Sequence, residues 1–129
     1  MKLKVSALFA AYITLTTIIN EKRELPQKGK YRIARLHEKL RSEFQIASAQ
    51  RDELVEQFGE EVKNEAGVAT GDWLVKQESE KFKPYMEAWS KIADEEIEIE
   101  AQPIPLDSLG DSGSIEAYEF LALGDLVAE

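Results

Sequence analysis

The sequence contains no cysteine and a single histidine among its 129 residues. The absence of cysteine excludes disulfide bonds and every site that uses a thiolate as nucleophile or metal ligand. The one histidine, His37, has no histidine or glutamate at the spacing that places two metal ligands on one helix face, so we interpret it as a surface helix residue. The 7 glycines are scattered and form neither a phosphate-binding loop nor a nucleophile elbow. We therefore expect no enzymatic activity, no cofactor and no metal ion.

Basic residues are missing from the last part of the chain. Residues 94–129 contain 11 Asp/Glu and no Lys/Arg, whereas residues 1–51 contain 11 Lys/Arg and 4 Asp/Glu, and the net charge is −9. Such a separation of charge requires a partner of opposite sign, inside or outside the molecule. We favour packing of the acidic C-terminal part on the basic N-terminal half. The sequence leaves open whether the acidic C-terminal part covers the basic residues.

Long apolar runs are lacking as well. The uncharged run Val5–Asn20 is shorter than the roughly 20 residues that span a bilayer, and its apolar residues recur on one helical face. We expect a buried helix over residues 7–20, capped by Ser6. The content of 43% hydrophobic and 32% charged residues is typical of a soluble globular protein, and the length predicts one domain over residues 1–129.

The longest predicted element is a helix over residues 27–58. Its apolar residues recur at spacings of three, four or seven: Ile33, Leu36, Leu40, Phe44, Ala47, Leu54 and Phe58. A further helix over residues 79–93 has one apolar face, although Pro84 favours a start near Lys81. The two helices predict a long antiparallel helical hairpin, with residues 60–75 as its hairpin tip or loop.

Acidic and β-branched residues alternate over residues 95–100, which predicts a strand with one buried face. The first five residues alternate in the same way with lysines. We expect residues 2–6 to pair with residues 96–101 in a small two-stranded sheet. The charge pairs expected across this sheet are Lys2 and Lys4 with Glu98 and Glu100.

The sequence thus predicts a mainly α fold, in which an N-terminal helix packs on the long hairpin and the small sheet closes the fold. A short C-terminal helix over residues 115–123, capped by Ser114, would lie across the basic N-terminal half. It belongs to an acidic segment, residues 102–129, which we expect to pack on the helices. The expected core comprises Leu8, Leu15, Ile33, Leu36, Leu40, Phe44, Tyr85, Trp89, Ile97, Ile99 and Leu121.

Charge clusters are the remaining signals for function. The basic part of the long helix could follow a phosphate backbone and indicates, as one alternative, a nucleic-acid-binding regulator that uses Lys28, Lys30, Arg32, Arg35 and Lys39. Conversely, the acidic surface could mimic nucleic acid and inhibit a host protein, with Glu53, Glu56, Glu60 and Glu61 as its phosphate-like row. The overall acidity makes nucleic acid the less favoured partner.

Binding of another protein is the leading hypothesis, because no catalytic constellation is present. We expect the binding surface in the stretch 95–109 and at the tip of the hairpin. The residues chosen there are Trp73, Glu95, Glu96, Glu98, Glu100, Leu106 and Leu109. Self-association through the helical hairpin is a further option.

The segment Leu25–Leu36, with its Leu-Pro, Lys28, Tyr31 and Ile-Ala-Arg, resembles the opening of a family of small bacteriophage-encoded proteins of unknown function. The resemblance continues through 51–59, 64–67, 96–100, 103–109 and the leucine-rich end at 120–127. It implies a phage accessory protein with a helical hairpin and a small β element. It also implies action in virion assembly or against a host target, a phage or host protein as partner, and a location in the host cytoplasm or in the virion.

Overall fold

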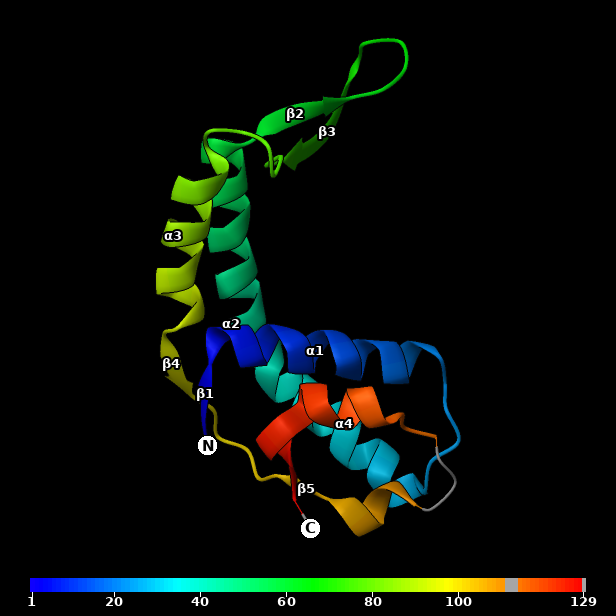
Figure 1. The fold of residues 1–129 in the computed structure, drawn as a ribbon. Helices are drawn as coiled ribbons and strands as arrows, with labels where there is room; N and C mark the ends of the chain where they lie inside the picture. Colours follow the sequence, from blue (N-terminus) through cyan, green and yellow to red (C-terminus); the bar gives the residue numbers. More distant parts are fainter. Residues whose placement is uncertain (111–113, 129) are drawn as a thin grey trace. The chain divides into compact units, whose positions relative to one another are not determined.

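The computed structural model describes residues 1–110 and 114–128, and these residues are mainly helical, as the sequence predicted (Figure 1). The α-helices of this part of the chain are α1 (Val5–Asn20), α2 (Gln27–Phe58), α3 (Phe82–Ala93) and α4 (Ala117–Leu123). Two 3₁₀ helices, η1 (Leu106–Leu109) and η2 (Gly124–Leu126), and three two-stranded sheets are also present there.

The chain divides into two compact units. The first consists of Met1–Phe44 together with the chain from Glu96 onward, and the second of Gln45–Glu95. Helix α2 contributes its earlier turns to the first unit and its later turns to the second. The single domain expected for residues 1–129 stays a prediction.

In the first unit, β1 (Lys2–Lys4) pairs antiparallel with β4 (Glu96–Glu98), which confirms the predicted sheet. Leu3 lies opposite Ile97, and Lys2 lies opposite Glu98. Lys4, however, lies opposite Glu96 and not opposite Glu100 as expected. The antiparallel direction is the reason, because the partner's number falls by two when the strand advances by two, so Lys4 meets Glu96 once Lys2 meets Glu98. Helix α1 begins at Val5, earlier than predicted, and Ser6 does not cap it.

The core of the first unit is one cluster of buried side chains from α1, α2 and the C-terminal segments. It comprises Leu3, Leu8, Ala11, Leu15, Ile18, Ile33, Leu36, Leu40, Ile99, Ile104, Leu109, Ile115, Leu123 and Leu126. Aromatic rings join α1 to α2, since the ring centroid of Phe44 lies 4.9 Å from that of Phe9 and 4.1 Å from that of Tyr12. The helical face predicted for α2 is therefore the face that is buried in this unit.

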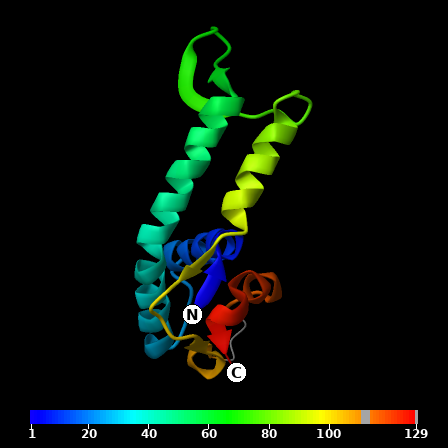
Figure 2. The ribbon, with the colours of Figure 1, turned by 90° about the vertical axis from the view of Figure 1, so that its left-hand side faces the viewer.

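The C-terminal segments complete this unit. Helix α4 packs on α1, and β5 (Ile104–Pro105) pairs in parallel with β6 (Val127–Ala128), a sheet that the sequence did not predict (Figures 1 and 2). The packing confirms that the short acidic helix lies on the N-terminal half. Its cap differs from the prediction, because Glu116 and Glu119 form a reciprocal capping box in place of Ser114.

One predicted core residue is wrong. Leu121 is 83% exposed, and Tyr118 on the same side of α4 is 69% exposed. The buried positions of α4 are Glu119 and Leu123. Glu119 forms an ion pair with Arg23, and this pair orients the helix with Glu119 inward and Leu121 outward, although the apolar spacing predicted that Leu121 would be buried.

In the second unit, the later turns of α2 and helix α3 run side by side in opposite directions, which confirms the helical hairpin (Figures 1 and 2). Helix α3 begins at Phe82, close to the Lys81 start that Pro84 favoured. The tip is an antiparallel β-hairpin of β2 (Glu60–Lys63) and β3 (Ala69–Leu74). The guanidinium of Arg51 lies 5.7 Å from the ring centroid of Trp89 and forms a cation–π contact between the two helices.

Candidate functional site

A groove of about 720 Å³ lies in the first unit between the earlier turns of α2 and the extended segment that precedes η1. The α2 wall consists of Lys28, Tyr31, Arg32, Arg35, Leu36 and Lys39. The opposite wall consists of Glu100, Ala101, Gln102, Pro103, Ile104 and Pro105. The groove therefore has one strongly basic wall and one wall that is largely apolar.

The basic wall follows directly from helical spacing. Lys28, Arg32, Arg35 and Lys39 are separated by four, three and four residues, which places them in one row on an α-helix. At a rise of 1.5 Å per residue the row is about 16 Å long. The neighbouring face of the same turns carries Ile33, Leu36 and Leu40 and is buried in the core. Anchoring of the apolar face thus turns the cations toward the groove.

The second wall is extended because of its prolines. Pro103 and Pro105 push the residues before them out of the α region. Ile104, between them, is 2% exposed and pairs with β6, so its backbone is fixed on the core side. The second wall of the groove is therefore an extended segment, fixed by its prolines and by the pairing of Ile104 with β6.

Gly29 sets how closely η1, which follows the second wall, approaches α2. A Cβ atom on this glycine would lie 2.2 Å from the carbonyl oxygen of Ser108 and 3.6 Å from Cα of Leu109. Real Cβ atoms essentially never come that close to a backbone oxygen. Only glycine at this position allows the observed contact between the first turn of α2 and η1.

The four cations have no carboxylate partner within the part of the chain that the structure describes, where the ion pairs join other residues. The polar contact made by this set is the hydrogen bond that Arg35 Nη1 donates to the hydroxyl of Tyr31, at 3.4 Å. Glu100 is the one acidic residue of the lining. Like charges three and four residues apart on a helix repel each other by roughly 0.2–0.5 kcal/mol per pair. The row therefore weakens the free protein slightly and favours a bound anion.

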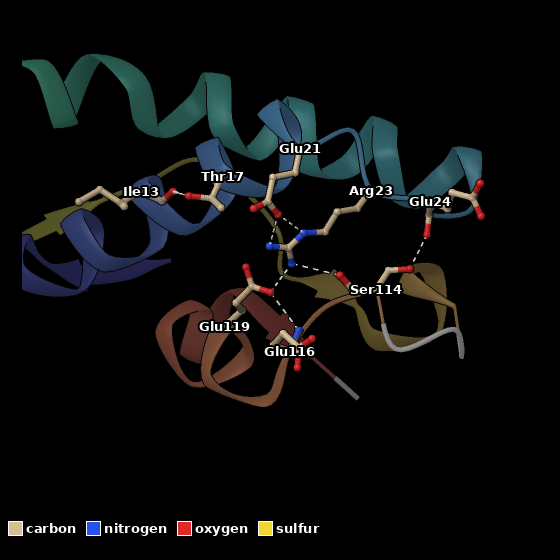
Figure 3. A network of polar contacts seen from close by, with 8 residues as sticks. All are labelled: Ile13, Thr17, Glu21, Arg23, Glu24, Ser114, Glu116 and Glu119. Atoms are coloured by element: carbon tan, nitrogen blue, oxygen red, sulfur yellow. Dashed lines mark hydrogen bonds and ion pairs between the residues drawn. The ribbon is translucent and has the colours of Figure 1, made fainter.

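The acidic C-terminal part pairs with another cation, Arg23 (Figure 3). Its guanidinium contacts Glu119, which is 2% exposed, and donates to the carbonyl oxygen of Ser114 at 3.1 Å. It also donates to Glu21 at 2.7 Å, while the hydroxyl of Ser114 donates to the carbonyl oxygen of Glu24 at 2.6 Å. The hydrogen bond from Arg23 lowers the pKa of Glu119. Glu119 thus pairs with Arg23, and no ion pair joins described residues 114–128 to the cations of the groove.

Four of the five residues in the predicted nucleic-acid set come together in the groove: Lys28, Arg32, Arg35 and Lys39. Lys30 is exposed and does not line it. The spacing of the cations could be recognised in the sequence. The second wall and the role of Gly29 were missed, because they depend on contacts between residues about 70 to 80 positions apart, which no local pattern reveals.

The residues predicted for protein binding do not form one cluster. Glu100 lines the groove, Glu96 and Glu98 lie exposed on β4, and Leu106 is 41% exposed. Leu109 is 3% exposed and belongs to the core, so its side chain is not available to a partner. The other two, Trp73 and Glu95, belong to the second unit, where Trp73 is 40% exposed on β3.

His37 lies half-buried between α1 and α2 and is not the surface helix residue that the sequence suggested. Its ring stacks on Tyr12 with centroids 4.4 Å apart, and its Nε2 lies 2.9 Å from the hydroxyl oxygen of Thr16. Since that hydroxyl donates to the carbonyl oxygen of Tyr12, Nε2 is the donor to Thr16. Burial lowers the pKa of His37, which favours the neutral ring at neutral pH. Among residues 1–110 and 114–128 no group of three or more potential metal ligands occurs.

Comparison of this chain with protein-family models, with curated proteins and with solved structures gave no match. None of the helices in the described part of the chain combines the length and apolar character needed to cross a bilayer.

Proposed function

We propose that this chain is a binding protein without catalytic activity of its own, and that its groove holds an acidic segment of another protein. The observation that carries the proposal is the row Lys28, Arg32, Arg35 and Lys39, which faces the groove without carboxylate partners in the described residues. Arginine is the side chain best suited to bind carboxylates, because its planar guanidinium offers two parallel donors.

The second wall supports a protein ligand. Ala101, Pro103 and Pro105 offer apolar surface beside the cations, and a peptide segment presents both carboxylates and apolar side chains. The net charge of −9 repels a long polyanion at a distance, whereas a short acidic segment carries less charge. We propose the setting implied by the phage resemblance, in which the chain acts as an accessory protein in virion assembly or on a host target.

The proposal is tested by fluorescence anisotropy with a fluorescein-labelled glutamate-rich peptide. The variant R32E/R35E should weaken binding at least about tenfold, because reversed charges in a groove cost more than 1.4 kcal/mol. The matched control K30E/R41E changes the net charge by the same amount on the same helix, but neither residue lines the groove. Equal loss of binding in both variants, or no binding by the wild type at low salt, would refute the proposal.

Single-stranded nucleic acid is a second candidate ligand, favoured by one specific observation. Tyr31 is 61% exposed beside the cations of the groove, and an exposed aromatic ring next to basic side chains can stack on a base. A fluorescein-labelled oligothymidylate tests this candidate. If it is correct, Tyr31→Ala should weaken oligothymidylate binding several-fold and weaken binding of the acidic peptide much less.

A further inference from the structure

The later turns of α2, which belong to the second unit, carry their own unpaired charges. Asp52, Glu53 and Glu56 are exposed, and no cation lies within ion-pair distance of them in the described residues. Glu60, just beyond the helix, already pairs with Lys76 at 3.6 Å. The same chain therefore presents an unpaired basic row in one unit and an unpaired acidic pair, Glu53 and Glu56, in the other.

We infer that the acidic segment held by the groove belongs to a second copy of this chain, and that Glu53 and Glu56 of that copy pair with Arg35 and Arg32. The inference rests on the proposed function, because it names the partner of the same groove. Charge complementarity supports it, since two arginines without carboxylates meet two carboxylates without cations.

Spacing favours a helix as the occupant. Arg32 and Arg35 are three residues apart, and Glu53 and Glu56 are also three residues apart on the same kind of element. Three residues of a helix span about 4.5 Å along its axis, so two antiparallel helices bring both pairs together at once. Carboxylates on one side of an extended strand recur every two residues, about 6.6 Å apart, and do not match this spacing.

Each copy offers one basic groove and one acidic pair. Association therefore produces a closed dimer if the two contacts are satisfied reciprocally, and an open chain if they are not. In both cases the association requires the groove of one copy and the later turns of α2 of another. Charge reversal on either side should abolish it, and reversal on both sides should restore it.

Sedimentation velocity over a range of concentrations tests the inference. Wild-type protein should sediment as an oligomer at high concentration, whereas R32E/R35E and E53R/E56R should each be monomeric alone. A mixture of these two variants should associate, because the acidic groove of one then accepts the basic helix of the other. The controls K30E/R41E and E80R/E87R match the charge changes at exposed residues outside the proposed contact and should associate like the wild type. Circular dichroism verifies that every variant is folded.

Two outcomes separate this inference from the proposed function. A wild type that stays monomeric at every concentration but still binds the glutamate-rich peptide overturns the inference and leaves the proposed function standing. A wild type that is monomeric and binds no acidic peptide overturns both. Association that R32E/R35E or E53R/E56R leaves unchanged, or a mixture of the two variants that stays monomeric, also overturns the inference, because the contact must then lie elsewhere.

Discussion

The pair of Arg23 and Glu119 shows how a single buried charge changes the orientation of a helix. Removing Glu119 would leave Arg23 with the exposed Glu21 as its remaining carboxylate partner, and breaking a buried pair is destabilising because the remaining charge is less well compensated. Arg23 keeps 14% of its side chain exposed, so the cost should fall near the lower end of the usual range. We expect Glu119→Gln to reduce the free energy of unfolding by about 2–3 kcal/mol, measured by denaturant unfolding at neutral pH. Glu21→Gln, which removes the exposed partner of Arg23, should cost much less.

The same pair should make stability depend on pH. The folded-state pKa of Glu119 lies below its ordinary value of 4.5, so its contribution is fully present above that value. It is lost as the pH falls through the folded-state pKa, because the folded protein must then take up a proton at a site that binds it weakly. Wild-type stability should therefore fall below about pH 4.5 more steeply than that of Glu119→Gln. Parallel pH profiles of the two proteins would contradict this account.

At the scale of elements, Gly29 decides how α2 meets η1. Replacing a helical glycine by alanine ordinarily stabilises a helix by up to about 1 kcal/mol. Here the added Cβ would meet the backbone of Ser108, which cannot rotate away as a side chain does. We expect the clash to outweigh propensity, so that Gly29→Ala lowers the free energy of unfolding by about 1–3 kcal/mol. It should also weaken peptide binding, because the second wall of the groove leads directly into η1.

The measurement is denaturant unfolding beside the anisotropy assay, with Lys30→Ala as the control on the adjacent exposed position. That control should change stability little, since Lys30 makes no ion pair in the described residues. If Gly29→Ala proves more stable than the wild type, the close approach of η1 is not required for the fold.

Elements whose signal lies in local spacing were predictable. The full length of α2, the start of α3 near Lys81 and the pairing of β1 with β4 follow from periodicity, a proline and alternating charges. The parallel pair of β5 and β6 was missed because each strand has two residues, too few to show an alternating pattern. The orientation of α4 was missed because a buried ion pair overrode its apolar period.

The candidate site divides in the same way. The spacing of the four cations predicted that they share one helix face, and the structure places all four, Lys28, Arg32, Arg35 and Lys39, in one groove. The opposite wall, residues 100–105, could not be predicted, because its prolines indicate an extended segment but do not indicate which element it packs against. Whether the acidic C-terminal part covers the cations was likewise undecidable from net charge. In the structure, Glu119 pairs with Arg23, and no ion pair joins described residues 114–128 to the cations of the groove.

At the scale of the whole molecule, the two units differ in how much they bury. The first has a continuous cluster of buried side chains, whereas the buried hydrophobic residues of the fully described second unit are Ala47 and Tyr85. The second unit also exposes large apolar side chains: Ile46, Val68, Trp73, Leu74 and Met86. Because burial of apolar surface is the main stabilising term, residues 45–95 should open locally more often than the first unit.

Hydrogen exchange followed by mass spectrometry measures this difference. At low protein concentration, amides of α3 should exchange at least about tenfold faster than those of α1, since local opening costs less where fewer contacts are lost. Comparable protection in α1 and α3 would show that the second unit is stabilised by interactions other than its own core.

Hydrogen exchange also tests whether α2 of one molecule binds the groove of a second copy. If Glu53 and Glu56 enter the groove of another molecule, the later turns of α2 should gain protection as the concentration rises. In E53R/E56R that gain should disappear while protection of α1 stays constant.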